Sequence, residues 1–292
     1  MDKLIIIDGN SLANRAFYGV PLLTNSKGVY TNAVYGFINM MLGFFKKQEP
    51  MYAAVAFDVS KKVFRHEKYA DYKGTRKGMP EELAEQMPIL KEILRSMNIA
   101  ILEKEGYEAD DIIGTVVKKA EENNIASIIL TGDKDSLQLI SELTEVYLTK
   151  KGISQTQKMD LAALAEEYGL NPAQICDLKG LMGDSSDNIP GVPGVGEKTA
   201  LGLIQKYHTV DYIYQNLDTI EVTKGVRAKL ENGRESAELS RKLAEITLEA
   251  PVELDMSAYE KKDGDPAEAA GILTEMEMFG VMKKLGLDKT AP

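Results

Sequence analysis

The first 150 residues alternate short apolar runs with longer stretches in which apolar residues recur every three or four positions. Short, continuous apolar runs are typical of strands that are buried on both faces of a parallel sheet. The longer stretches have the periodicity of amphipathic helices. This alternation predicts an α/β domain with a mostly parallel sheet flanked by helices. The expected strands are 4–7, 53–57, 99–102, 127–130 and 146–148, and the expected helices are 32–47, 81–97 and 108–123.

The strand patterns stop near residue 160, and only helical patterns follow. Pro172 and Pro266 each stand at the start of a predicted helix, where the missing N–H costs nothing. We therefore expect two domains, an α/β domain over residues 1–170 and a helical lobe over residues 171–292. Helices in the second part are expected at 161–168, 173–182, 198–207 and 236–248.

Acidic residues stand at the ends of the predicted strands. They directly follow the first, second and fourth strands, and an acidic group opens the helix after the third. The carboxyl ends of parallel strands meet at one edge of a sheet, and α/β proteins bind ligands at that edge. We therefore expect acids from four distant segments to converge there. The seven acids are Asp8, Asp58, Glu108, Asp110, Asp111, Asp133 and Asp135.

Carboxylates at this density stay ionised together only when cations compensate them. Hard oxygen ligands suit Mg²⁺ or Mn²⁺. Cys176 is the single cysteine, and His66 and His208 are the only histidines. A zinc site and a Ser-His-Asp triad therefore have too few residues to build on. Any one acid alone would suit a helix N-cap or a solvated loop, but acids after each of four strands favour one metal-binding cluster.

Two more acids, Asp184 and Asp187, stand among turn-forming residues just before a Gly-rich segment, 190–200, that opens a helix. Such a segment presents backbone N–H groups to a phosphate. It is not a nucleotide-binding P-loop, because Glu197 stands where Lys is required and no strand precedes it. Two interpretations remain open. The segment is either a hairpin between two helices that grips a nucleic-acid backbone, or a helix–helix turn that needs glycine.

Residues 61–77 carry seven Lys or Arg side chains against two acidic ones, with Tyr69 and Tyr72 among them. Cations for phosphates and rings for stacked bases suit single-stranded nucleic acid. A charge run is more often a solvated face, but solvated faces usually mix signs. The net charge of −10, from 35 basic and 45 acidic residues, argues against a nucleic-acid partner. Once the clustered acids are set aside, however, the remaining charges nearly balance.

These motifs resemble those of the structure-specific 5′-nucleases, flap endonucleases in the broad sense, and most of all the N-terminal 5′-nuclease domains of bacterial DNA polymerase I. The resemblance covers essentially the whole chain. The matching strings are Ile-Asp-Gly-Asn at 7–10, Thr-Asn-Ala-Val-Tyr-Gly-Phe at 31–37, Phe-Arg-His-Glu at 64–67, Tyr-Lys-Gly-Thr-Arg at 72–76, Tyr-Glu-Ala-Asp-Asp at 107–111, Gly-Asp-Lys-Asp at 132–135 and the run over 183–200.

The resemblance implies a PIN-like, mostly parallel sheet flanked by helices. It implies a basic helical arch at about 61–95 and a helical DNA-binding lobe with a helix-three-turn-helix at about 184–210. The implied activity is a metal-dependent 5′-3′ exonuclease and 5′-flap endonuclease that hydrolyses DNA phosphodiesters in replication and repair, removing flaps and RNA primers. The implied cofactors are two Mg²⁺ or Mn²⁺ ions, with a K⁺ ion at the helix-three-turn-helix.

The resemblance also assigns roles to residues. Asp8, Asp58, Glu108, Asp110 and Asp111 correspond to ligands of one metal centre, directly or through water. Asp133, Asp135, Asp184 and Asp187 extend the cluster toward a second metal. Lys73 and Arg76 correspond to the catalytic arch residues that reach the scissile phosphate. The implied DNA contacts are Tyr72, as a stacking residue, with Arg65, Gly191, Gly194, Val195, Gly196, Lys198 and Thr199.

The expected partner is branched or flapped DNA with a 5′ single strand. Two interpretations of the chain itself stay open: a domain that is covalently linked to a polymerase domain in a longer protein, or a stand-alone paralogue. A cytoplasmic protein without membrane attachment is expected, because the apolar run at the N-terminus is too short for a signal peptide or a membrane span. We also expect a monomer. Two alternatives remain. A PIN-type ribonuclease would share the sheet and the acids but is usually shorter and lacks the Gly-rich hairpin. A non-catalytic DNA-structure-binding module would be expected to have lost some of the acids.

Overall fold

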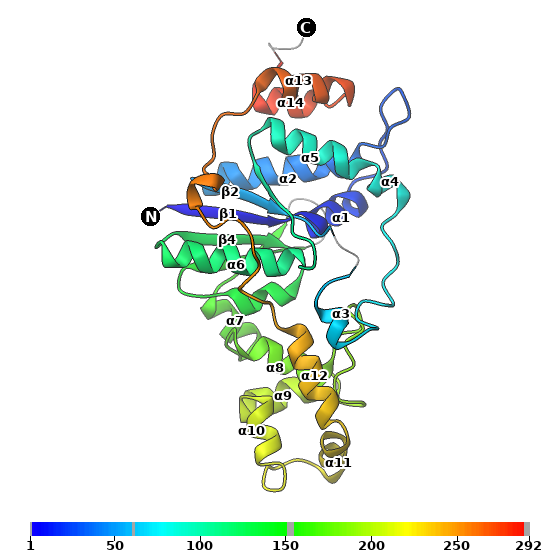
Figure 1. Cartoon of the computed structure of the whole chain (residues 1–292), viewed down its shortest axis with the longest axis vertical. Helices are drawn as coiled ribbons and strands as arrows, with labels where there is room; N and C mark the ends of the chain where they lie inside the picture. Colours follow the sequence, from blue (N-terminus) through cyan, green and yellow to red (C-terminus); the bar gives the residue numbers. More distant parts are fainter. Residues whose placement is uncertain (1, 60–61, 151–154, 289–292) are drawn as a thin grey trace.

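The structure, a computed structural model, describes residues 2–59, 62–150 and 155–288. The strands of these residues form one sheet in the order β3-β2-β1-β4-β5-β6 (Figure 1). Strands β1 to β5 run parallel, and β6 pairs antiparallel with β5 at the edge. The predicted mostly parallel sheet is therefore confirmed. The strands are β1 (Lys3–Asp8), β2 (Tyr52–Ala56), β3 (Ala100–Leu102), β4 (Ala126–Thr131), β5 (Thr144–Thr149) and β6 (Thr156–Met159).

Helices cover both faces of the sheet, which explains why its central strands are apolar along most of their length. Along β1, Leu4 and Ile6 enter one core, whereas Ile5 and Ile7 enter the other. The first core packs beneath α6 (Ala109–Glu122). The second packs beneath α1 (Gly9–Gly19), α2 (Asn32–Gln48) and α5 (Gln86–Ser96). Side chains alternate between the two faces of a strand, so a strand that is buried on both sides has no solvent-facing side for polar residues.

A helical lobe extends below the sheet in Figure 1 and shares the core beneath α6. Within it, α8 packs against both α9 and α12. Several of its helices begin at an acid or a threonine whose side chain accepts a hydrogen bond from a backbone N–H of the first turn, as at Asp160, Thr209 and Thr223. The helices are α7 (Leu161–Tyr168), α8 (Gln174–Met182), α9 (Glu197–Tyr207), α10 (Val210–Gln215), α11 (Lys224–Asn232) and α12 (Arg234–Ala244).

The last two helices do not belong to this lobe, which differs from the domain division that we expected. The chain leaves α12 and passes the 3₁₀ turn η2 (Met256–Tyr259) beside β2. It then forms α13 (Pro266–Glu275) and α14 (Phe279–Leu285), which pack on α5 and α2 at the opposite end of the molecule (Figure 1). Leu273 and Val281 are buried in the core above the sheet. Burial of this apolar face is what draws the segment back to the sheet.

The predicted basic arch, residues 61–95, is not one continuous helix. Its described part contains two helices of four residues, α3 (Arg65–Lys68) and α4 (Glu81–Ala84), joined by turns and extended chain. Lys61, the first residue of the predicted arch, lies outside the described residues. The end of the predicted range is α5, whose Leu90, Ile93 and Leu94 are buried against the sheet domain. The stretch free to act as an arch is therefore shorter than 61–95.

Among the described residues, no helix combines the length and the hydropathy needed to cross a bilayer.

Candidate active site

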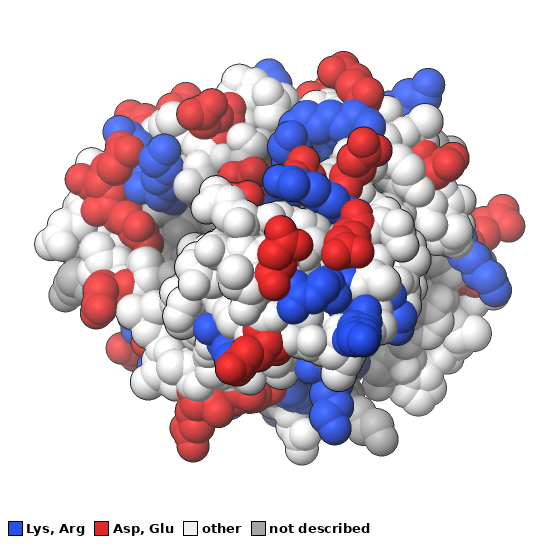
Figure 2. Space-filling model, turned by 90° about the horizontal axis from the view of Figure 1, so that it is seen from below, with Lys and Arg blue, Asp and Glu red and all other residues white. Residues whose placement is uncertain are grey.

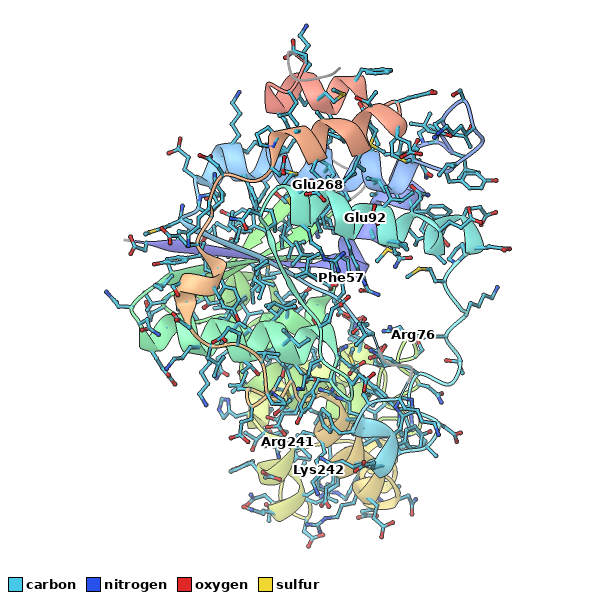
Figure 3. All side chains as sticks on the ribbon, turned by 45° about the horizontal axis from the view of Figure 1, so that its top comes forward. Phe57, Arg76, Glu92, Arg241, Lys242 and Glu268 are labelled. Carbon is cyan, nitrogen blue, oxygen red and sulfur yellow. The ribbon has the colours of Figure 1, made fainter. Side chains whose placement is uncertain are left out.

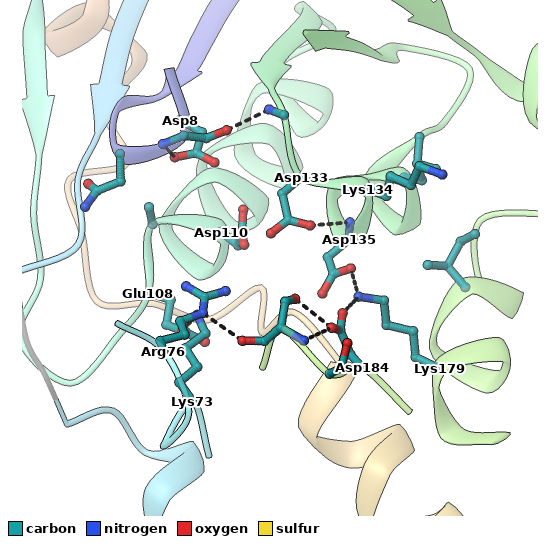
Figure 4. A pocket seen from close by; sticks show the side chains of 18 of the residues that line it. Asp8, Lys73, Arg76, Glu108, Asp110, Asp133, Lys134, Asp135, Lys179 and Asp184 are labelled. Carbon is teal, nitrogen blue, oxygen red and sulfur yellow. Dashed lines mark hydrogen bonds and ion pairs between the residues drawn. The ribbon is translucent and has the colours of Figure 1, made fainter. Parts of the chain in front are cut away.

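A cavity of about 790 Å³ lies at the carboxyl edge of the sheet, where the sheet domain meets the helical lobe (Figure 4). Seven of the nine predicted acids line it, as do four basic side chains. Negative charge therefore exceeds positive charge in this cavity. The acids are Asp8, Asp58, Glu108, Asp110, Asp133, Asp135 and Asp184, and the basic residues are Lys73, Arg76, Lys134 and Lys179.

Asp8 ends β1 and caps α1. Its carboxylate accepts hydrogen bonds from the Ser11 backbone N–H at 2.9 Å and from Thr131 Oγ1 at 2.8 Å. Burial, together with the nearby charges of Asp58 and Asp133, raises the pKa of Asp8 to about 7. A Cβ at Gly9 would lie only 2.3 Å from the Phe57 ring, so a side chain there would push the ends of β1 and β2 apart. Glycine at this position thus keeps Asp8 near Asp58.

The Asp58 carboxylate links the second strand to the acidic helix start. Its Oδ1 accepts a hydrogen bond from the Ala109 backbone N–H at 2.7 Å, at the beginning of α6. Its own backbone N–H donates to Asn10 Oδ1 at 3.0 Å. An acid at a helix N-terminus is favoured by the helix dipole. The segment after β2 is therefore fixed to the starts of α1 and α6 at one corner of the cavity.

Asp110 carries the least compensated charge of the cluster. Its Oδ1 is buried and has no hydrogen-bond partner within the described part of the chain. Burial, and then the charges of Asp133, Asp8 and Asp135, raise the pKa of Asp110 well above its usual value. A buried carboxylate oxygen without a donor carries an uncompensated free-energy cost, and a bound cation would remove that cost.

Lys179, on α8, pairs with both Asp135 and Asp184 across the cavity (Figure 4). Although burial alone would raise it, this ammonium lowers the pKa of Asp184 to about 2. Burial and the Asp133 charge still raise the pKa of Asp135 to about 7 against the pull of Lys179. The sequence analysis missed Lys179. Almost the whole of α8 is buried, so the two charged side chains on it, Asp177 and Lys179, must find partners. This is the feature that points to Lys179.

Lys73 and Arg76 reach the other side of the cavity from the basic segment (Figures 3 and 4). Lys73 Nζ pairs with Glu108 and lies 3.7 Å from Asp187 Oδ2. Arg76 pairs with Asp187, and its Nε donates to the Ser186 carbonyl at 3.1 Å. Asp187 itself is buried beneath these two cations and does not line the cavity. Both cations line the cavity, and their present partners are carboxylates.

Arg65, Tyr72 and Asp111 have contacts other than those expected from the sequence. Arg65 is only 2% exposed and makes a two-pronged ion pair with Asp111, both distances being 2.8 Å. It also donates to Glu108 Oε2 at 2.7 Å. Asp111 is 0% exposed and does not line the cavity. Tyr72 is 3% exposed, and its hydroxyl lies 3.0 Å from Glu108 Oε2. All three lie outside the cavity lining and contact Glu108, which they support from behind.

The Gly-rich segment forms the turn between α8 and α9. Gly191 has a φ of 63°, and its N–H donates to Ser240 Oγ at 2.8 Å. A Cβ there would lie 2.3 Å from the Gly183 backbone nitrogen, so both halves of the turn need close backbone approach. Val195 is buried, whereas Gly194, Gly196, Lys198 and Thr199 are exposed. Figure 2 looks onto the end of the lobe and shows basic and acidic side chains intermixed there.

The described residues contain no group of three or more Asp, Glu, His or Cys side chains already arranged to hold a metal ion. The ammonium groups of Lys73 and Lys179 lie between carboxylates that would otherwise share a cation. The chemistry of the donor set, which consists of oxygens with one orphaned buried atom on Asp110, nevertheless fits a hard divalent ion. Asp111 and Asp187 stand apart from the other seven acids as structural partners of Arg65, Lys73 and Arg76.

Because the folded state raises the pKa of Asp8, Asp110 and Asp135, it binds more protons than the unfolded chain between about pH 4 and pH 7. In chelator, the free energy of unfolding should therefore fall as the pH rises from about 5 to about 7.5. The contribution of Asp184, whose pKa is lowered, to the free energy of unfolding rises with pH only at pH values below this window. Urea denaturation at several pH values checks this, with Asp110→Asn as the comparison. An Asp110→Asn slope as steep as that of the wild type would contradict the assignment.

Two family models cover most of the chain. The model of the 5′-3′ exonuclease N-terminal resolvase-like domain matches residues 3–169, and that of the 5′-3′ exonuclease C-terminal SAM fold matches residues 170–267. DNA polymerase I of Bacillus subtilis is 44% identical over 98% of this chain, and that of Bacillus caldotenax is 46% identical over 97%. The chain spans about a third of the length of these relatives, 32% in both cases.

Solved structures share the fold. A T5 5′-exonuclease structure with bound divalent metal ions (zinc) has a TM-score of 0.68 at 21% identity, covering 98% of this chain and 99% of that one. The catalytic core of Rad2 in complex with a DNA substrate has a TM-score of 0.61 at 15% identity, covering 98% of this chain and 91% of that one. The resemblance drawn from the sequence motifs is thus confirmed, and the chain belongs to the 5′-3′ exonuclease family, with both its N-terminal resolvase-like domain and its C-terminal SAM fold.

Proposed function

We propose that this chain is a divalent-metal-dependent, structure-specific 5′-nuclease that hydrolyses phosphodiesters in flapped or branched DNA, as a 5′-3′ exonuclease and a 5′-flap endonuclease. The observation that carries the proposal is the cavity lined by seven acids of the predicted cluster, with a buried, unpartnered Asp110 oxygen. Its place between the sheet and the lobe gives a substrate two surfaces to contact. The family match and the likeness to nuclease structures with metal ions or DNA support the same function.

The proposed cofactors are two Mg²⁺ or Mn²⁺ ions. Asp8, Asp58, Glu108 and Asp110 would hold one ion, directly or through water, and Asp133, Asp135 and Asp184 would hold the other. When bound, the ions would activate water and stabilise the leaving oxygen. We now leave Asp111 and Asp187 out of the metal ligands, because their carboxylates pair with Arg65, Lys73 and Arg76 outside the cavity lining.

The basic residues of the chain would act on the phosphate. Lys73 and Arg76 already face the cavity, and each would exchange its present carboxylate partner for a phosphate oxygen of the substrate. Such donors stabilise charge that develops in the transition state. No histidine lines the cavity, so its carboxylates would orient cations rather than serve beside a histidine base.

The turn between α8 and α9 would hold duplex DNA at a distance from the cavity. The backbone N–H groups of Gly194, Val195 and Gly196, together with Lys198 and Thr199, would contact a phosphate there. A K⁺ ion at this turn is also proposed, although the Gly194 carbonyl already accepts a hydrogen bond from Lys229 Nζ at 2.9 Å. In the same proposal the nuclease and DNA-binding parts divide near residue 170, and the protein acts as a cytoplasmic monomer joined to a polymerase domain, with replication and repair as its setting.

Neighbouring acids provide a matched pair of variants. Asp110→Asn should lower the rate of 5′-flap cleavage by roughly a hundredfold or more, while stability holds or rises because a buried, unpartnered charge is removed. Asp111→Asn should instead destabilise the fold by up to about 3–5 kcal/mol, because the buried Arg65 loses one of its two carboxylate partners. Single-turnover cleavage in Mg²⁺ and urea denaturation measure the two effects. Wild-type cleavage by Asp110→Asn at limiting Mg²⁺ would contradict the metal-ligand assignment.

The hairpin is tested with Gly196→Val, because nothing lies within 4 Å of a Cβ at this position and its φ of −88° suits any residue. The added side chain should block the approach of a phosphate and weaken binding to flapped and double-stranded DNA, by an amount that shrinks at high salt. Cleavage of a short single-stranded 5′ end should change much less.

Gly202→Val is the control, since its Cβ also meets nothing and it lies farther along α9. Equal losses on both substrates, or none on either, would mean that the segment is only a helix–helix turn.

A further inference from the structure

The two ends of the acidic cavity are unlike. At one end, Asp8 accepts hydrogen bonds only from uncharged donors, and Asp110 Oδ1 has no partner among the described residues. At the other end, Asp135 and Asp184 share the ammonium group of Lys179, which is only 8% exposed (Figure 4). Among the described residues, Asp8 and Asp110 therefore have no cationic partner, although Glu108 beside them pairs with Lys73, whereas Asp135 and Asp184 both pair with Lys179.

Within the described residues, no other basic side chain pairs with Asp135 or Asp184. Lys134 also lines the cavity, but its Nζ lies 5.5 Å from the centre of the Tyr168 ring and makes no ion pair within the described residues. Lys179 reaches the two acids from α8, which is held in place by α9 and α12. Its position therefore depends on packing of the lobe and not on a mobile loop.

An ammonium group and a divalent ion compete for these two carboxylates, because Lys179 occupies Asp135 Oδ1 and Asp184 Oδ2 while Ser186 donates to Asp184 Oδ1. A Mg²⁺ ion needs ligand oxygens at about 2.0–2.1 Å. The Lys179 ammonium group occupies the space between the two carboxylates that the ion would have to enter. Repulsion between two cations this close is strong inside a protein. Binding of a metal at Asp135 and Asp184 thus requires that the lysine withdraw.

We propose that Lys179 is a resident counter-ion that competes with a divalent metal for Asp135 and Asp184. The metal therefore binds first at the Asp8 and Asp110 end, and it binds more weakly at the other end. This inference rests on the proposed metal-dependent function. It adds an order of occupancy and names the residue that sets it.

The test is Mn²⁺ binding, measured by calorimetry on the whole chain and four variants. Lys179→Met removes the charge but keeps the side-chain length, and Lys179→Gln does the same with a hydrogen-bond donor in place of the ammonium. Lys179→Arg keeps the charge, and Lys134→Met removes a cavity lysine that pairs with no acid of the cluster. Both neutral Lys179 variants should bind the weaker Mn²⁺ ion roughly tenfold or more tightly. Lys179→Arg and Lys134→Met should match the wild type.

Weaker-site affinities for the neutral Lys179 variants equal to or below that of Lys134→Met would overturn the proposal. Absence of Mn²⁺ binding by every protein, the wild type included, would overturn the proposed function along with it. The two failures are therefore distinguishable.

A second measurement uses the unmodified protein and does not depend on a variant folding. Acetylation of lysine amines, followed by peptide mass spectrometry, reports how free each amine is. Saturating Ca²⁺ should raise the acetylation rate of Lys179 several-fold while that of Lys134 stays constant. The ion has only to bind at the acids and does not have to support cleavage. An unchanged rate at Lys179 under saturating Ca²⁺ would show that the lysine does not withdraw.

Discussion

Eight carboxylates, Glu197 among them, line one cavity, and the four basic side chains that line it cannot balance them. The arrangement of the sheet makes this imbalance unavoidable. Parallel strands bring their carboxyl ends to one edge, and three of the strand ends together with the start of α6 each contribute acids there. The cost appears in the raised pKa values of Asp8, Asp110 and Asp135. A fold that concentrates charge in this way is stable only when protons, lysines or metal ions compensate the charge.

Arg65 couples this cluster to the rest of the molecule. It joins Glu108 and Asp111 at the start of α6, and it donates to the carbonyls of Leu243 at 2.9 Å, in the last turn of α12, and of Glu245 at 2.6 Å, just after that helix. Arg65 itself lies on α3, which is part of the basic segment, residues 61–77. A single buried guanidinium thereby ties the basic segment, the acidic helix start and the lobe together. Planar, multiply donating arginine suits this task better than lysine does.

Much of the site could be predicted from the sequence, because its acids follow strands and strand ends are local features. Asp8, Asp58, Asp133 and Asp135 were found in this way, and all four line the cavity. Contacts between distant segments could not be predicted. The bridge from Lys179 to Asp135 joins α8 to the end of β4, and the inward turn of Arg65 depends on carbonyls almost 180 residues away. The return of α13 and α14 to the sheet is a packing result that no local pattern encodes.

The central claim is that the acidic cavity becomes catalytic only when divalent cations compensate its charge. The most direct measurement incubates the protein with a branched DNA that carries a labelled single-stranded 5′ flap, in chelator and in excess Mg²⁺, and resolves bound and cleaved DNA. The account predicts release of the flap in Mg²⁺ and none in chelator. Binding of the branched DNA without cleavage in either condition would contradict it and indicate a structure-binding module. Cleavage of an RNA strand alone would contradict the proposed substrate.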